Sequence, residues 1–506
     1  MPAQNMCHKR CKNAQGMCYK CFGEKALKDS DTAAAAPISK QDPDRMGKEP
    51  IGRLIAEFSI PAIISMVFSA LYNVVDSIFL GIAVPMTGLA VMTLALPIQM
   101  ILMGLSGLAG QGGNALAAIF LGEGKRKEAE NILGNTTLLL IIIAILAAVL
   151  SLVFMEPMLR LIGTTDSLME PTRQFLDIVC ALNIFSSLGM GLNHFLRTAG
   201  RPNLALFTGM LGTLACIAFN ALFVLVLGWG ISGSAWATIA GQTVGMIPVL
   251  WFLIFNKKSP FNLRLKKMSP RPRLMGRILV MGLASFLMQA ASTLVGVVLN
   301  RLLGYYGAMI PMGADAALST IGTVQKIGWF VITPLFGLIM GVQPLIGYNY
   351  GAKNFDRVLK VLKLGIIWAC LLGLICWILV MFGAEMLVSL FNVEQNLIPF
   401  TAKAQRIYCL FLPIVGFQIM GSSYFQSSGQ PIKSAILELT RQVIFLMPLY
   451  VFLPHILPQL FNVTGLDSIV IAAPCSDGLA IIVTAIFVVI EVRRLLKRIK
   501  EQKDQA

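Results

Sequence analysis

A stripe of polar side chains runs along one apolar stretch of the chain, between residues 65 and 81. The stretch reads SMVFSALYNVVDSIFLG, and its other positions are mainly Met, Val, Phe, Leu and Ile. Its polar members recur every three or four residues, which places them on one face of a helix: Ser65, Ser69, Tyr72, Asn73 and Asp76. A carboxylate in an apolar helix can bind a cation or exchange a proton. We therefore predict a functional role for Asp76; the alternative is a helix-end carboxylate held by a neighbouring hydroxyl or Lys.

The composition is typical of a protein that crosses a membrane many times. Of its 506 residues, 56% are hydrophobic and 13% are charged, whereas soluble domains carry about 25% charged residues. An ionised Asp in a membrane span costs roughly 2.5–3.5 kcal/mol on insertion scales, so we expect Asp76 to face a hydrated, protein-lined cavity. Twelve apolar segments are long enough to span hydrocarbon: 54–81, 88–120, 131–155, 171–196, 203–227, 232–256, 276–303, 313–348, 358–383, 397–427, 432–454 and 466–492.

The positive charges are distributed as membrane topology requires. The net charge of +16 would suggest a nucleic-acid partner, but 34 of the 41 Lys and Arg residues lie in the two tails and the even-numbered loops. The odd-numbered loops hold only Arg160 and Arg301. This distribution predicts twelve spans with both termini in the cytoplasm and no nucleic-acid partner.

The two halves of the chain repeat one another. FLRTAGRPNLA after the fourth segment matches YFQSSGQPIKSA after the tenth, so Gly200 corresponds to Gly429 and Pro202 to Pro431, an offset of 229 residues. A repeat of six segments gives both halves the same orientation, with a pseudo-two-fold axis along the membrane normal. We predict an all-α polytopic membrane protein of twelve transmembrane helices in two six-helix bundles. The predicted parts are a polar, Cys-bearing tail (1–50), an N-terminal bundle (51–256), a basic cytoplasmic linker (257–275), a C-terminal bundle (276–492) and a basic tail (493–506).

The N-terminal tail carries four closely spaced cysteines: Cys7, Cys11, Cys18 and Cys21. Such a group can hold a tetrahedral Zn²⁺. However, the C-x3-C-x6-C-x2-C spacing is not a standard zinc-finger pattern, and the segment lacks a hydrophobic core. A disordered tail of reduced thiols is the alternative.

Two bundles with a cavity between them are typical of a transporter, and ligand sites in such folds lie near the membrane midplane. Glycines of the second segment favour close helix packing, mobility or both: Gly104, Gly107, Gly110, Gly112 and Gly113. The sequence contains no G-x-x-x-x-G-K-[ST] motif and no soluble domain for ATP. An ion gradient therefore remains as the energy source, with Asp76 as the candidate carrier, and we predict no enzyme activity.

Four motifs resemble the multidrug and toxic compound extrusion (MATE) family, in particular its bacterial multidrug pumps. They are LYNVVDSIFLG, FLRTAGRPNLA, GISGSAWATIAGQ and QPLIGYNYGAKN, and the resemblance covers roughly residues 50–495 in matching order. It implies a multi-pass protein of the bacterial inner membrane. It also implies export of lipophilic or cationic drugs and toxic compounds by alternating access, in exchange for H⁺ or Na⁺.

The resemblance also implies which residues form the coupling site. Asp76 matches an acid that takes part in coupling, and Asn220 and Thr238 match an amide and a hydroxyl that complete a cation site. Many members carry a second acid where this chain has Val224, and one branch carries a Glu that our alignment places at Ser292. With a single carboxylate, the site favours H⁺ over tight Na⁺ binding. We expect no cofactor other than the coupling ion and any Zn²⁺ in the tail.

Candidate residues of the substrate cavity come from both bundles. Glu438 and Arg441 lie three residues apart on one helix, so they either neutralise each other or contact substrate and lock a conformation. Expected partners are small-molecule drugs or organic cations and membrane lipids, with the chain acting as a monomer. The alternative function is a lipid-linked precursor flippase of related architecture. The candidates for the substrate cavity are Tyr72, Asn73, Gln343, Lys326, Glu438 and Arg441.

Overall fold

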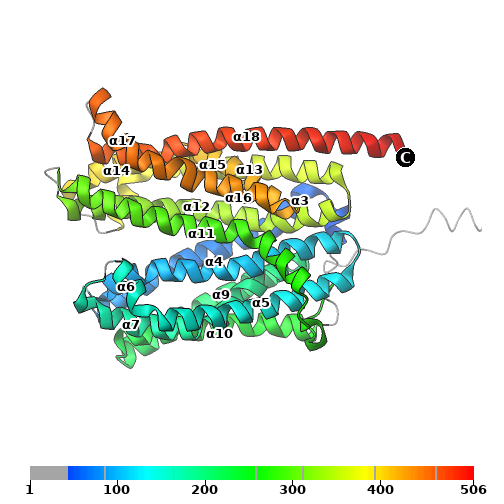
Figure 1. Cartoon of the computed structure of the whole chain (residues 1–506), viewed down its shortest axis with the longest axis horizontal. Helices are drawn as coiled ribbons and strands as arrows, with labels where there is room; N and C mark the ends of the chain where they lie inside the picture. Colours follow the sequence, from blue (N-terminus) through cyan, green and yellow to red (C-terminus); the bar gives the residue numbers. More distant parts are fainter. Residues whose placement is uncertain are drawn as a thin grey trace, which may run out of the picture.

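The computed structural model describes residues 44–84, 87–162, 164–256, 259–309, 313–391, 395–461 and 464–505. The described part of the chain is helical, and its long helices form two groups that lie side by side (Figure 1). The first group, the N-lobe, contains α3 (Ile51–Ala83), α4 (Thr87–Gly122), α5 (Arg126–Val153), α6 (Met155–Ile162), α7 (Asp166–Ala181), α8 (Asn183–Thr198), α9 (Pro202–Asn220), the π-helix η1 (Ala221–Val226) and α10 (Gly230–Phe255). A short helix, α2 (Arg45–Lys48), precedes it, and η2 (Leu265–Met268) lies in the linker that follows.

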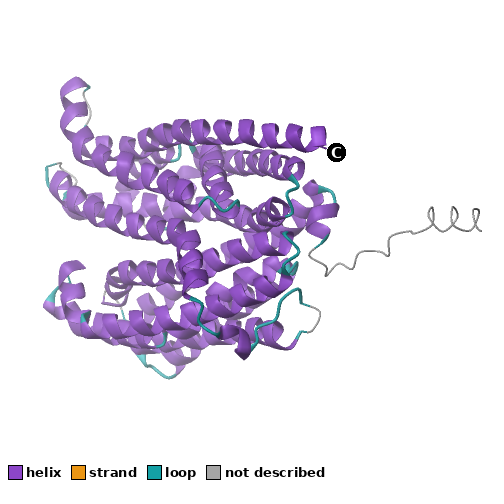
Figure 2. Ribbon diagram, turned by 45° about the vertical axis from the view of Figure 1, so that its right-hand side comes forward, coloured by secondary structure: helices purple, strands orange, loops and turns teal. Residues whose placement is uncertain are grey.

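The second group, the C-lobe, repeats this order. It contains α11 (Pro272–Gly307), α12 (Ala314–Gly351), α13 (Phe355–Ser389), η3 (Gln395–Leu397), α14 (Ile398–Tyr408), α15 (Leu412–Ser427), α16 (Pro431–Leu439), the π-helix η4 (Thr440–Leu446), α17 (Met447–Leu460) and α18 (Gly465–Gln505). The described residues are helix and short loops when seen from a second direction as well (Figure 2).

Length and hydropathy single out most of the predicted spans. Nine helical stretches of the described chain are long and apolar enough to cross a membrane. Two bent pairs bring the number to eleven: α7 with α8, bent by 53°, and α14 with α15, bent by 46°. The bent pairs occupy corresponding places in the two lobes. The 41-residue helix α18 is the twelfth long element.

The repeat is visible in the backbone of the connecting turns. Gly200 and Gly429 both adopt φ of 77°, and Pro202 and Pro431 each begin the next helix. A left-handed residue ends the preceding helix and a proline pre-sets φ for the next one. The predicted correspondence of these turns at an offset of 229 residues is confirmed.

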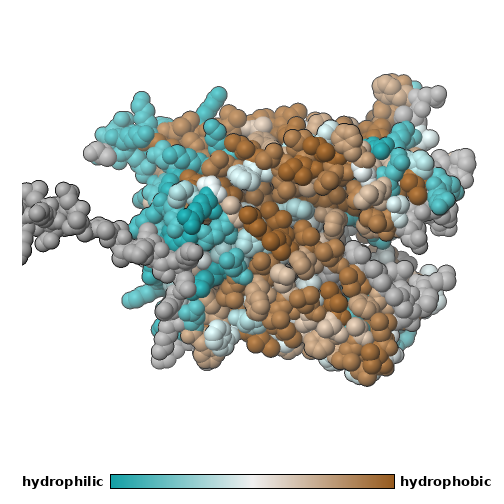
Figure 3. Space-filling view, turned by 180° about the vertical axis from the view of Figure 1, so that it is seen from behind, coloured by the Kyte–Doolittle hydropathy of each residue, from teal (hydrophilic) through white to brown (hydrophobic). Residues whose placement is uncertain are grey.

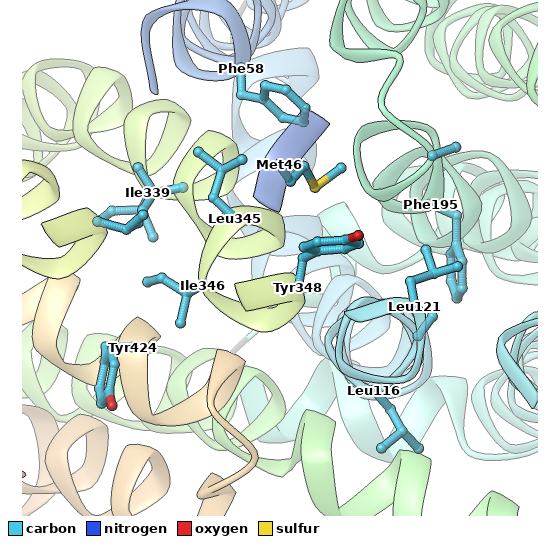
Figure 4. Packing of buried hydrophobic residues seen from close by; sticks show 14 of the residues in the cluster. Met46, Phe58, Leu116, Leu121, Phe195, Ile339, Leu345, Ile346, Tyr348 and Tyr424 are labelled. Atoms are coloured by element: carbon cyan, nitrogen blue, oxygen red, sulfur yellow. The ribbon is translucent and has the colours of Figure 1, made fainter. Parts of the chain in front are cut away.

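The lobes share one hydrophobic core at one end of the molecule and have separate cores at the other. The shared core joins α3, α4 and α8 to α12, α13 and α15, and Tyr348 of α12 lies near Met46 within it (Figure 4). A second cluster belongs to the N-lobe alone, and two further clusters belong to the C-lobe alone. The end with the shared core is hydrophilic at its surface, whereas the sides of the molecule are largely apolar (Figure 3). We call it the basic end, since it carries Lys125, Arg201, Lys353 and the end of α18, and we call the opposite end the far end.

Glycines allow the lobes to approach closely. A Cβ on Gly112 would lie 2.6 Å from the backbone nitrogen of Gly282 in α11, and one on Gly104 would lie 3.0 Å from the Cβ of Gln289. Within the N-lobe, a Cβ on Gly110 would lie 2.6 Å from the Cα of Gly191. The prediction that the α4 glycines serve close packing is confirmed.

The short helix α2 joins both lobes at the basic end. Arg45 forms ion pairs with Glu49 at 2.6 Å and Glu57 at 2.9 Å, and these carboxylates raise its pKa above the ordinary value. On the other side, the Tyr348 hydroxyl donates to Asp44 at 2.9 Å, and Asn349 Nδ2 donates to the carbonyl of Met46 at 3.0 Å. The chain that enters α3 is thus fixed to α12.

Candidate functional site

Asp76 lies inside the N-lobe. Its side chain is 2% exposed, and Ser234 Oγ of α10 donates a hydrogen bond to Asp76 Oδ1 at 3.0 Å. Ser234 is itself fully buried. The prediction that Asp76 faces a hydrated, protein-lined cavity stays a prediction: the described neighbours of its carboxyl group are side chains of the same lobe. Two described members of the polar stripe of α3 face α9 and α10: Ser65 lies against Gly209 of α9, and Asp76 accepts from Ser234 of α10.

Asn220 places an amide beside the same carboxyl group. It is the last residue of α9, it is 0% exposed, and its amide is close enough to the Asp76 carboxyl group for a hydrogen-bond interaction. Neither of its side-chain amide atoms has an aligned hydrogen-bond partner in the described part of the chain. The next residue begins the π-helix η1, where Val224 is buried. A buried amide without a partner is rare in folded proteins, and it often marks a position where an ion or water binds.

Thr238 lies one turn beyond Ser234 on the same face of α10. Its side chain is half-buried, and its carbonyl accepts a hydrogen bond from Cys216 Sγ of α9 at 3.6 Å. The structure thus brings Asp76, Asn220 and Thr238 into one region between α3, α9 and α10. It adds Ser234, which sequence reasoning missed although the spacing of four residues from Thr238 was available as a signal.

Chemically, this group combines one carboxylate with neutral amide and hydroxyl groups. Oxygen atoms of these kinds are ligands for Na⁺, and the same carboxylate can take a proton. Within the described side chains, no cation of the protein forms an ion pair with Asp76. We call Asp76, Asn220, Ser234 and Thr238 the N-lobe site.

The C-lobe holds a different polar group. Arg441 Nε donates to Asp477 Oδ1 of α18 at 2.7 Å, and Ser476 Oγ donates to the Arg441 carbonyl at 2.7 Å. The guanidinium of Arg441 forms its ion pair with Asp477, and Glu438 is close enough for an attractive interaction between its charge and that of Arg441. The predicted mutual neutralisation of Glu438 and Arg441 therefore stays a prediction, to which the structure adds Asp477 as the hydrogen-bonded partner. The π-helix η4 begins at Thr440, between Glu438 and Arg441. We call Arg441 and Asp477 the C-lobe pair.

The remaining candidates for the substrate cavity are distributed over other surfaces. Gln343 Nε2 donates to Ser423 Oγ at 2.9 Å, a contact inside the C-lobe. Lys326 is exposed and lies three turns before Gly337, which packs against Ile63 of α3. Lys326 therefore lies on the face of α12 that is turned towards the N-lobe, about 16 Å further towards the far end.

Some candidates lie outside what the structure describes. These are the side chains of Tyr72 and Asn73 and the whole of Cys7, Cys11, Cys18 and Cys21. Within the described residues, no group of three or more His, Cys, Asp or Glu side chains could hold a metal ion. A Zn²⁺ site formed by the four cysteines of the tail therefore stays a prediction.

Two six-helix lobes joined at one end, with a polar site buried in the membrane-spanning region, define a polytopic membrane transporter. The MatE family model matches residues 61–222 and 279–452, one block in each lobe and more than half of the chain. The chain belongs to the MATE family, as the sequence motifs predicted.

Individual relatives and structures agree with this assignment. The chain is 25% identical over 428 residues to the multidrug export protein MepA of Staphylococcus aureus strain MSSA476, which covers 83% of this chain and 90% of the relative. For MepA of Staphylococcus haemolyticus the identity is 24% over 420 residues, covering 82% and 89%.

Solved structures show the same fold. An outward-facing conformation of a multidrug resistance MATE family transporter of the MOP superfamily matches with a TM-score of 0.82 and 23% identity, covering 90% of this chain and 98% of that one. A MOP superfamily transporter from Pyrococcus furiosus, whose binding pocket is described as having reverse polarity, matches with a TM-score of 0.82, 22% identity and coverage of 89% and 98%. The predicted fold of twelve helices in two bundles is confirmed.

Proposed function

We propose that this protein is a secondary antiporter that exports lipophilic or cationic drugs and toxic compounds in exchange for H⁺ or Na⁺. The observation that carries the proposal is the N-lobe site: a buried carboxylate, Asp76, whose neighbours are the neutral hydroxyl of Ser234 and the neutral amide of Asn220. A buried carboxylate without a cationic partner gains most from a proton or a cation supplied from outside. The related MepA proteins are named multidrug export proteins, which supports this class of substrate.

The division of the hydrophobic cores supports alternating access. The lobes share a core at the basic end and have separate cores towards the far end. Such an arrangement has one closed side, and rocking of the lobes about their interface would open it. With the basic end in the cytoplasm of a bacterial cell, as the charge distribution predicts, the described conformation faces outward.

Helix α3 connects the N-lobe site to the interface between the two lobes. It carries Asp76 near one end, and its other end packs against α12 of the C-lobe through Ser59, whose Oγ donates to the Leu338 carbonyl at 3.0 Å. Between them lies Pro61, which provides no backbone N–H and weakens the helix locally. Binding of H⁺ or Na⁺ at Asp76 changes how α3 packs on α9 and α10, and α3 transmits this change to the interface between the lobes.

The test is drug efflux from proteoliposomes under a pH gradient or a Na⁺ gradient, applied separately. Wild-type protein should export a fluorescent lipophilic cation under one of the two gradients, which identifies the coupling ion. Asp76→Asn keeps the shape of the side chain but removes its charge, so gradient-driven efflux should fall to the level of empty liposomes. Asp177→Asn is the matched control, because Asp177 is a surface carboxylate of the same lobe and pairs with Arg173. Full coupled efflux by the Asp76 variant would disprove the proposed role.

One observation favours the alternative function, a lipid-linked precursor flippase. The exposed Lys326 projects from the inter-lobe face of α12, and a cation there attracts acidic groups and repels cationic drugs. The same liposomes separate the two functions when they contain a fluorescent lipid-linked phosphate. Translocation of that lipid, without efflux of the lipophilic cation under either gradient, would favour the flippase.

A further inference from the structure

We propose that a groove at the basic end binds the headgroup of an anionic phospholipid. The groove lies between the start of α3 and the start of α13, and its volume is 470 Å³. Three cations and no carboxylate are among its lining residues, which suits a phosphodiester. The lining residues are Pro50, Ile51, Gly52, Arg357, Lys360, Lys363 and Leu364.

The three cations differ in how they are held. Arg357 is fixed, because its Nη2 donates to the carbonyls of Met46 at 3.1 Å and Glu49 at 2.6 Å, and its Nε donates to Asn349 at 3.2 Å. Lys360 and Lys363 are exposed, and neither forms an ion pair with a described carboxylate. The groove therefore combines one preorganised cation with two cations whose charges the described protein leaves unpaired.

The surface beyond the groove identifies a lipid, rather than free phosphate, as the occupant. Exposed apolar side chains continue from Lys360 and Lys363 along the same face of α13 at intervals of three or four residues. They are Ile367, Leu371, Leu374, Ile378 and Phe382, which are 40–85% exposed. A helix with such a stripe lies against acyl chains, and long basic side chains at its end reach the headgroup level. A phospholipid can occupy both surfaces at once.

In the N-lobe, the corresponding groove is covered by protein. There the linker lies against α5: the backbone N–H of Arg271 donates to Asn135 Oδ1 at 2.9 Å, and the carbonyl of Lys267 lies against Gly134. Glu128, the counterpart of Arg357, pairs with Arg271 at 3.8 Å. In the N-lobe, the linker thus covers the start of α5, and the carboxylate of Glu128 offsets the charge of Arg271.

No described segment covers the C-lobe groove in this way. Residues 44–49, which precede α3 as the linker precedes α11, turn towards α12 and contact Tyr348 and Asn349 instead. Residues 1–43 are another source of cover, but they carry more Lys and Arg than Asp and Glu. Like charge makes them a poor partner for Arg357, Lys360 and Lys363.

The groove joins the two lobes, because Pro50–Gly52 belong to the N-lobe side and α13 belongs to the C-lobe. A bound headgroup would contact both, so it would favour the conformation in which the basic end is closed. This inference goes beyond the exported substrate, since the lipid would act as a bound regulator and not as cargo.

The test is native mass spectrometry of the full-length protein released from nanodiscs that contain phosphatidylcholine with phosphatidylglycerol. Wild type should retain phosphatidylglycerol, and Lys360→Gln/Lys363→Gln should retain it roughly thirtyfold more weakly, the effect of removing two cations from a membrane-surface phosphate. Arg493→Gln/Lys500→Gln is the matched control: it removes the same charge from exposed positions of α18, outside the groove, and should retain lipid as wild type does.

Three results would overturn the proposal. Equal loss in both double variants would mean that general surface charge holds the lipid. Displacement of phosphatidylglycerol by inorganic phosphate at low concentration would mean that the groove recognises phosphate without acyl chains. If wild type retains no phosphatidylglycerol, the groove does not bind an anionic phospholipid.

Discussion

The N-lobe and the C-lobe each bury an aspartate among membrane-spanning helices, but they surround it with different chemistry. Asp76 has a neutral hydroxyl donor, Ser234, and a neutral amide, Asn220, as neighbours. Asp477 pairs with a guanidinium at 2.7 Å, and it is 9% exposed against 2% for Asp76. The repeat therefore preserves the scaffold and not the electrostatics.

The difference indicates which lobe can exchange an ion. Removing one partner of a buried ion pair leaves an uncompensated charge, so such a pair tends to stay intact. A carboxylate without a cationic partner has no such constraint, and an ion from solution can complete its surroundings. We infer that the N-lobe carries coupling, whereas the C-lobe pair links η4 to α18.

The π-helices show that the two sites are not symmetry copies. Both interrupt the helix that follows the repeated Gly and Pro turn, but α9 runs for 19 residues before η1 and α16 for only 9 before η4. Asn220 and Arg441 therefore lie at different depths along equivalent helices. A π-helix changes which side chains share a face, and each lobe uses it to direct a different group inward.

Breaking the C-lobe pair should have the largest effect on stability. Arg441→Gln leaves Asp477 without its partner, and we expect a loss of about 3–5 kcal/mol of stability, as for other buried ion pairs that lose one member. Asp76→Asn should cost little, because its carbonyl oxygen can still accept from Ser234. Thermal unfolding in detergent measures both. The double variant Arg441→Gln/Asp477→Asn should recover most of the loss, and an equal loss in Asp76→Asn would contradict the contrast between the lobes.

A pair of serine substitutions sharpens the same comparison with a smaller effect. Ser234→Ala removes the described donor to Asp76, a contact of about 1 kcal/mol, so coupled efflux under a subsaturating gradient should fall roughly fivefold. Ser476→Ala removes a hydrogen bond of similar geometry from the C-lobe pair and should leave the ion dependence unchanged. Initial rates in proteoliposomes test both. A similar change in the two variants would assign no special role to Ser234.

Much of the fold could be predicted from the sequence because apolar length, charge distribution and the repeat are local or periodic signals. The turns at Gly200 and Gly429 were found in this way, and the polar stripe on the helix around residues 65–81 singled out Asp76. Asn220 and Thr238 were predicted only through the resemblance to the MATE family. Ser234 was missed because a serine in a Gly- and Ala-rich helix looks like ordinary small-residue packing.

The partner of Arg441 could not be found by spacing. The Glu438–Arg441 prediction assumed a regular α-helix, and a π-helix gives no clear signal in a single sequence. Its actual partner, Asp477, is 36 residues away in the chain and reaches it only through the packing of η4 against α18. The same limit applies to Asp76, because the surface that this residue faces depends on how α9 and α10 pack against α3.

The smallest predicted effect concerns a turn in which the lobes differ by one residue. Gly124 adopts φ of 74° with no atom within 4 Å of an added Cβ, and its counterpart Lys353 adopts φ of 55°. Gly124→Lys should therefore lower stability by about 1 kcal/mol through backbone strain alone, because a side chain disfavours this conformation. Lys353→Gly should gain less than Gly124→Lys loses, because the added glycine increases the entropy of the unfolded chain. Thermal unfolding midpoints of the two variants check this. A midpoint of Gly124→Lys equal to that of wild type would mean that the N-lobe turn relaxes, and that only the C-lobe turn is held in place by its neighbours.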